Sequence, residues 1–433
     1  MGRSIVIGLM VLLTSACPAA AADGAVSLQD AYVAALQSNE TVKISQENVF
    51  QADSRVDQAW SYLYPRVTGN GSYVRYNETL PPNGGTTIFQ PLGQFQASVV
   101  LSQPIYTGGR ALAALRAAKT LQESSRNDLL TSKQSIMLGV AESYYAVLRS
   151  QRIVEVSRDA LARMERHRTV TEREASTRRS KANVSALLRA NTLVDQARTN
   201  LVLAETGLKV AEQQFSLLTQ LPEKSVLAEP PTLDTPGESL PKLQELALQN
   251  RDDYVSSQMG QKVAKENVNI VAGAHYPQLH AEGGLKYVDS SPATMLDATT
   301  YYGGIFLEVP IFEGGLMRAE VAEAKSKERQ AQLSTELLRR TIQNEVAEAY
   351  INYQAIATVL ETTKTQFENA RKNFDTVESL FSEGLLASLS VIDAQQALYL
   401  AERELVAASI EQQLSLLRLR KAMGLLGKVA ATS

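Results

Sequence analysis

The residue types that most often perform chemistry are few in this chain, and they are not grouped. The three histidines, His167, His275 and His280, have no metal-ligand spacing with acidic neighbours, and no HExxH pair is present. GLLGK at 424–428 lacks the spacing of a phosphate-binding Walker A loop, and no GxSxG nucleophile elbow occurs. The sequence therefore predicts no enzyme, no cofactor and no metal site.

The N-terminus has the pattern of a secretory signal peptide over residues 1–22. Arg3 supplies a positive charge, an apolar stretch follows, and small residues precede a cut near Asp23. The only cysteine, Cys17, lies inside this segment, so the mature protein is expected to have no disulfide bond. A lipoprotein signal with Cys17 lipidated is the alternative, and Thr14 counts against it because such signals usually carry Leu there.

Bulk composition narrows the class of partner. The 433-residue chain is nearly neutral, with 43 Lys plus Arg against 46 Asp plus Glu, which gives no support to nucleic acid as a partner. After the signal segment no run approaches the roughly 18 to 20 apolar residues that a membrane-spanning helix requires. If the protein crosses a membrane, we expect it to do so by strands.

An internal repeat divides the mature chain into two halves, residues 23–238 and 239–433. The matching segments are ALQSN at 35–39 with ALQNR at 247–251, and PIYTGGR at 104–110 with PIFEGGL at 310–316. The matches keep their order and nearly keep their spacing. Each half is therefore expected to build the same structural unit.

Each unit is predicted to contain a helix, a strand pair and a long helical hairpin. The first helix of each unit is expected to run unbroken for about 38 residues and to end at a proline, because the residue before proline disfavours helix. The predicted helices cover 27–64 and 239–276, the strand pairs about 66–105 and 278–312, and the hairpins 111–220 and 316–426.

In the predicted strand segments, apolar and polar residues alternate with a period of two. An apolar side and a polar side over about ten residues is typical of a strand that faces lipid on one side and water on the other, although ordinary half-buried strands alternate too. The residues of the apolar side are Phe95, Ala97, Val99 and Leu101, then Leu279, Ala281, Gly283, Leu285 and Tyr287, and finally Tyr301, Ile305, Leu307 and Val309. His280 belongs to the polar side.

The hairpin segments show a stripe of alternating large and small residues. The stripe runs by steps of three and four from Leu187 to Ala211 and again from Val391 to Ala408. Such a stripe lets two helices approach closely and interlock, so each hairpin is predicted to be a coiled pair of helices. An ordinary core face is the plainer interpretation.

The repeated proline and glycine segment is predicted to connect each strand pair to its long helix. Proline is expected to end the strand ladder, and the glycines permit backbone angles that other residues avoid. The residues concerned are Pro104, Gly108 and Gly109 in the first unit and Pro310, Gly314 and Gly315 in the second.

The chain supplies too few strands to close a barrel alone. Two pairs give four strands, and an open sheet edge is not tolerated in lipid. Several copies must then contribute to one barrel, and three copies would give twelve strands, which is compatible with an open lumen.

The sequence resembles the TolC-like outer membrane efflux family. The resemblance is carried by SLQDAYVAALQSNETVK, LYPRV, PIYTGGR, PIFEGGL and SEGLLASLSVIDAQQALYLAE, and it covers about 27–425. It implies a mainly α-helical protein with membrane strands: a homotrimer with a twelve-stranded β-barrel in outer membrane lipid of a Gram-negative bacterium and a periplasmic α-barrel built from the hairpins. Such proteins are passive exit ducts for tripartite efflux or type I secretion, recruited by a periplasmic adaptor and driven by an inner-membrane transporter.

The resemblance also implies residues at the periplasmic entrance. Gly384 and Leu385 match the hairpin tip that meets the adaptor, and Asp393 matches an aspartate that lines the entrance. Ser390 stands where the family often has a second aspartate, so an acidic ring here would contain fewer carboxylates. For Asp393, a solvated residue near a helix start is the plainer interpretation.

The tip of the first hairpin departs from this pattern. Ser180 stands where its counterpart is Gly384, and Arg178, Arg179 and Lys181 make the tip basic. These charges could steer an adaptor, although a charge run is more often only a solvated surface. Before the first strand, Trp60, Tyr62 and Tyr64 could sit at the inner membrane–water interface or pack between helices.

A secreted or periplasmic coiled-coil scaffold is the alternative function class. In that protein the strands would only cap the helical hairpins, and no channel activity would follow. A periplasmic adaptor fits less well, because adaptors need β-rich domains around a single hairpin, whereas this chain has two.

Overall fold

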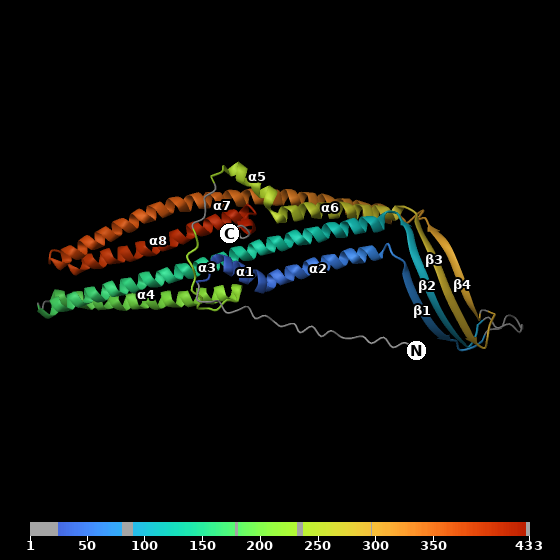
Figure 1. Cartoon of the computed structure of the whole chain (residues 1–433), viewed down its shortest axis with the longest axis horizontal. Helices are drawn as coiled ribbons and strands as arrows, with labels where there is room; N and C mark the ends of the chain where they lie inside the picture. Colours follow the sequence, from blue (N-terminus) through green and yellow to red (C-terminus); the bar gives the residue numbers. More distant parts are fainter. Residues whose placement is uncertain (1–24, 80–89, 178–180, 232–236, 296, 430–433) are drawn as a thin grey trace, which may run out of the picture.

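The computed structural model describes residues 25–79, 90–177, 181–231, 237–295 and 297–429. The molecule is elongated, with a four-stranded sheet at one end and long helices that run from it to the opposite end (Figure 1). Two helical hairpins lie alongside each other, and short helices gather near the middle of their length (Figure 1). No helix within these ranges is both long and apolar enough to cross a bilayer.

The two repeats build the same succession of elements. The first contains α1 (Leu28–Ser38), α2 (Glu40–Ser61), β1 (Arg66–Arg75), β2 (Gly93–Thr107), α3 (Arg110–Thr177) and α4 (Lys181–Thr219). The second contains α5 (Leu240–Asn250), α6 (Asp252–Ala272), the short 3-10 helix η1 (Gly273–His275), β3 (Gln278–Ser291), β4 (Ala298–Glu308), α7 (Leu316–Ser382), α8 (Ser388–Ala422) and α9 (Leu426–Val429).

The prediction of an unbroken first helix in each repeat is wrong. The helix breaks at Asn39 in the first repeat and at the equivalent Arg251 in the second, where ψ is 128° and 118°. Asn39 closes α1 through its backbone N–H, and its side chain caps α2 by accepting a hydrogen bond from Thr41 N. The break lets the short helices α1 and α5 leave the line of α2 and α6 (Figure 1).

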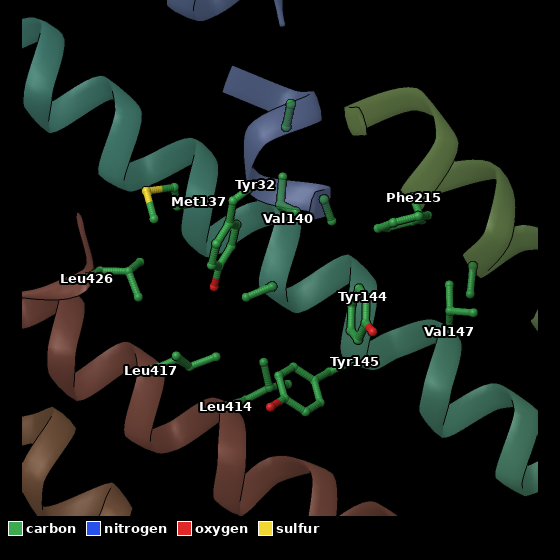
Figure 2. Close-up of a cluster of buried hydrophobic side chains, with 14 residues drawn as sticks. Tyr32, Met137, Val140, Tyr144, Tyr145, Val147, Phe215, Leu414, Leu417 and Leu426 are labelled. Atoms are coloured by element: carbon green, nitrogen blue, oxygen red, sulfur yellow. The ribbon is translucent and has the colours of Figure 1, made fainter. Parts of the chain in front are cut away.

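The largest buried apolar cluster lies where α1 meets the long helices. Figure 2 shows Tyr32 from α1, Met137 to Val147 from α3, Phe215 from α4 and Leu414 and Leu417 from α8 around one core. The Tyr144 hydroxyl, a single donor, lies within hydrogen-bond distance of two backbone oxygens, that of Val26, at 2.9 Å, and that of Ala228. Burial raises the pKa of Tyr144 to about 12. This core, which we call the collar, joins both repeats because α8 belongs to the second.

Each hairpin is held together by its striped faces. On α4, Ala190, Val194, Ala197 and Ala211 are buried, which confirms the predicted large and small stripe. In the second hairpin Phe374 and Phe381 of α7 pack against a row from α8, namely Val391, Ala394 and Leu398. The second hairpin is therefore packed through apolar side chains, and in the first hairpin the ion pairs Arg158–Glu205 and Arg198–Glu165 also join α3 to α4.

Candidate functional site: the sheet and the hairpin tips

The sheet joins the two repeats and leaves two edges open. Its order is β1-β2-β3-β4, and every neighbouring pair is antiparallel. The central β2–β3 ladder crosses from one repeat to the other. Within the described part of the chain, the outer edges of β1 and β4 have no strand partner. Their backbone groups are available to pair with another strand.

One face of the sheet is apolar and exposed. The register aligns Val99 with Leu285 and then Tyr301, so these side chains stand on one face. Tyr301 is 78% exposed and Ile305 70% exposed in the single chain. A contiguous apolar surface of this kind needs a nonaqueous or protein neighbour. The further members of this face are Val67, Tyr73, Phe95, Ala97, Leu101, Ala281, Tyr287 and Leu307.

The opposite face is polar. Asn70, Ser98, Lys286 and Thr300 form one row across the four strands. On the same face the Tyr302 hydroxyl donates to Oε1 of Glu282, its diagonal neighbour on β3, at 2.7 Å. The sheet is thus amphipathic, as the alternation predicts. His280 lies on this polar face and stacks on Phe306, with ring centroids 5.3 Å apart.

The two strand-to-helix connections differ in detail. β2 continues through Pro104 to Thr107, with a register shift between Pro104 and Tyr106, so the prediction that Pro104 ends the ladder is wrong. A bulge accommodates the missing N–H there. β4 ends at Glu308, before Pro310.

The paired glycines of both connections adopt positive φ. The angles are +65° and +81° at Gly108 and Gly109, and +62° and +90° at Gly314 and Gly315. Gly108 also touches the backbone at Gly273, where a β-carbon on Gly108 would lie 2.1 Å from the Gly273 oxygen. Gly314 has open space around it. The first connection is therefore a packed joint, and the second is a free turn.

The tip of the second hairpin is a glycine-capped turn. Gly384 has φ +77°, and its N–H donates to the oxygen of Phe381, while the Leu385 N–H donates to the oxygen of Leu380. The Leu385 side chain is exposed. Ser390 lies half-buried in the first turn of α8, and Asp393 is exposed one turn later.

Three predicted contact residues belong to the tip of the first hairpin. Arg178 and Arg179 lie outside the described residues, and Lys181 is the first residue of α4. The entrance and adaptor roles predicted for both tips stay predictions at this point.

A polar seam between the two hairpins was not anticipated from the sequence. Arg163 of α3 pairs with Glu402 of α8 at 2.8 Å. The Gln395 side chain donates to the oxygen of Ala160 at 3.3 Å. His167 of α3 contacts Ser388 of α8 at 2.8 Å. The sequence gives only one local signal of this seam. Its α3 members, Ala160, Arg163 and His167, are spaced by three and four residues, which places them on one face of the helix.

The aromatic residues before β1 lie beside the sheet. Trp60 stacks on Tyr64, with centroids 6.2 Å apart, and the Lys119 ammonium lies 5.3 Å from the Trp60 ring centre. Tyr62 and Tyr64 are largely exposed. Within the ranges that the structure covers, no group of three or more metal-binding side chains gathers anywhere.

The chain matches a known family over most of its length. The model of the outer membrane efflux protein family matches residues 31–219 and 243–425, one segment in each repeat. TolC of Vibrio cholerae is 25% identical over 348 residues, covering 77% of each chain, and TolC of Escherichia coli is 23% identical, covering 93% of this chain and 83% of its own.

Solved structures share the fold. The crystal structure of CusC superposes with a TM-score of 0.79 at 19% identity, covering 92% of both chains. The Campylobacter jejuni CmeC outer membrane channel gives 0.80 at 17% identity, covering 92% of this chain and 86% of its own. The sheet, the two hairpins and the family match together place this chain in the outer membrane efflux protein family.

Proposed function

We propose that three copies of the chain form a duct through the outer membrane. The observation that supports this most is the amphipathic sheet with two open edges. Because all pairs in the sheet are antiparallel, β1 and β4 run in opposite directions. β4 of one copy can therefore pair with β1 of the next in the same antiparallel pattern. Three copies close twelve strands, with the apolar face in lipid and the polar face around water.

The helices extend this duct away from the membrane. α3 contains 68 residues and α7 contains 67. At about 1.5 Å per residue each is roughly 100 Å long, which is far more than the thickness of a bilayer. We infer that the hairpins form a periplasmic tunnel whose entrance lies at the tips, opposite the sheet (Figure 1).

Energy for transport comes from partners in this proposal. Relatives include a cation efflux protein of Escherichia coli, CusC, and a solvent efflux pump component of Pseudomonas putida, SrpC. By analogy an inner-membrane transporter drives export, in a tripartite efflux or type I secretion assembly. A periplasmic adaptor would contact Gly384 and Leu385 at one tip and Arg178, Arg179 and Lys181 at the other.

The two faces of β2 provide a matched test of the membrane orientation. Val99 belongs to the apolar face and the adjacent Val100 to the polar face. We expect Val99→Arg to cost about 2–4 kcal/mol, because it puts a charge into lipid, and Val100→Arg to cost much less, because it faces water. The measurement is the yield of assembled protein in isolated outer membranes. Equal yields for the two variants would contradict the orientation.

The exposed carboxylate of Asp393 is expected to influence ion selectivity. Three symmetry-related copies near a narrow entrance would attract cations. Asp393→Asn should lower the ratio of cation to anion permeability by about twofold or more. Reversal potentials in a planar bilayer measure this ratio. Asp195→Asn, on the other hairpin, serves as the control. An unchanged permeability ratio in Asp393→Asn would contradict the placement of Asp393 at the entrance.

Membrane flotation and bilayer conductance test the proposed function as a whole. The duct should float with outer membranes and conduct ions after purification in detergent. A coiled-coil scaffold would instead remain monomeric in detergent-free buffer and would not conduct.

A further inference from the structure

One buried histidine touches both helices of the neighbouring hairpin at its tip. His167 of α3 is 7% exposed, and its Nε2 lies 2.8 Å from Ser388 Oγ, at the first residue of α8. The ring packs on Phe381 of α7, with centroids 5.2 Å apart. Phe381 and Ser388 stand on either side of the Gly384 turn. This imidazole therefore joins α3 to both helices of the second hairpin beside its turn.

The contact belongs to a seam that differs from the interiors of the hairpins. Near its tip the second hairpin is packed through apolar side chains, whereas the Arg163–Glu402 pair and the Gln395 hydrogen bond join it to α3. The apolar collar also joins α3 to α8, but through residues 137–147 of α3 and 414–417 of α8. Hydrogen bonds across the seam can be exchanged for bonds to water at little net cost. Separating the apolar faces of α7 and α8 within the second hairpin would cost more free energy, because it would expose apolar surface to water. The two hairpins can therefore separate most easily at the tip end of the seam, while the collar stays packed.

Charged groups on the surrounding elements do not neutralise a proton on His167. None of the ion pairs among the described residues includes His167. Arg163 is engaged with Glu402, and the adjacent Arg168 is itself cationic. Glu165 of α3 is half-buried and pairs with Arg198 of α4 at 3.1 Å. Other charged groups of these helices near the tip are exposed, among them Arg166, Glu172 and Arg173 on α3, Arg189 on α4, Glu378 and Glu383 at the end of α7, and Asp393 on α8.

We propose that His167 is a proton-sensitive latch between α3 and the tip of the second hairpin, so that acidification releases this tip from α3. A neutral imidazole fits the buried contact, whereas a charged one must lose its hydration there without a counter-charge. The tip is the duct entrance only if the proposed function is correct. The latch itself requires only the contact.

The sign of the pH effect follows from the burial of the ring. Burial lowers the pKa of His167 from its ordinary value of 6.5. The released state, in which the ring meets water, binds the proton more readily. The latch is therefore fully effective above about pH 6.5 and weakens as the pH falls below that value.

Hydrogen–deuterium exchange of the intact protein in detergent tests the latch. The probe is the peptide covering residues 381–390, compared at about pH 7.5 and about pH 5.5 after correction for the intrinsic exchange rate. We expect the corrected rate to rise several-fold at the lower pH in the unmodified protein. His167→Gln keeps a neutral hydrogen-bonding group, so its corrected rate should not change with pH. His275→Gln, an exposed site beside the sheet, should keep the full response.

Two results would overturn the latch. The first is that the corrected exchange rate of the unmodified protein is the same at both pH values. This result can be obtained without any variant. The other is a rise of the same size in His167→Gln. Conductance at neutral pH tests the duct separately: a pH response without any conductance would leave the latch standing and refute the proposed function.

Discussion

Gly108→Ala is expected to destabilise the protein by about 4–5 kcal/mol, a large effect for one methyl group. The new β-carbon would lie 2.1 Å from the oxygen of Gly273 and 3.1 Å from the β-carbon of Tyr276. The obstacle is backbone, so relief requires moving the β2–α3 connection away from the end of α6. A positive φ of +65° adds strain for any residue with a side chain.

Gly314→Ala is the matched control for this prediction. Gly314 occupies the equivalent position of the second repeat with φ +62°, and nothing lies within 4 Å of its added β-carbon. We expect a cost of only about 1–2 kcal/mol, from backbone strain alone. Thermal unfolding followed by circular dichroism compares the two variants. Equal losses would show that the packed joint at Gly273 has no energetic role.

Arg251→Met is expected to cost about 3 kcal/mol because it leaves two carboxylates without their partner. The Arg251 side chain is only 9% exposed and donates to Asp253 at 3.0 and 2.6 Å, and also to Glu345. Burial alone would raise the pKa of Asp253, but the hydrogen bonds from Arg251 outweigh it and lower that pKa. Arg251 thereby ties the break between α5 and α6 to α7.

Lowering the pH should reduce the difference in melting temperature between Arg251→Met and the unmodified protein. In the unmodified protein the Asp253 contribution is present above the ordinary pKa of 3.8 and is lost as the pH falls below it. In Arg251→Met the Asp253 carboxylate lacks the Arg251 hydrogen bonds and is protonated more readily, so the gap in melting temperature should shrink as the pH falls to about 4 and below. Arg340→Met, which breaks a pair with side chains 71% and 41% exposed, should cost under about 1 kcal/mol. A gap that stays constant with pH would contradict the pairing argument.

The amphipathic sheet was predictable because its signal is local. Alternation along Phe95 to Leu101 assigns each side chain to a face, and the observed register brings the apolar members of all four strands together. The stripe on α4 is local in the same way. Internal repetition then supports both, since each pattern occurs in the two halves.

Features that depend on long-range contact were missed. The break at Arg251 is stabilised by Glu345, far away in the chain, and Asn39 caps its own break with a single side-chain hydrogen bond. His167 gave no sign of its role, because Ser388 is brought to it only by the packing of one repeat on the other. The identical glycine pairs likewise hide the fact that only Gly108 meets a neighbouring backbone.

The central claim is that the open edges of the sheet are closed by other copies of the same chain. Electron cryomicroscopy of the purified protein in lipid nanodiscs tests it most directly. The account predicts a threefold particle in which β4 of each subunit pairs with β1 of the next to complete a twelve-stranded wall. A particle in which β1 and β4 of a subunit remain unpaired, or pair with each other, would contradict it.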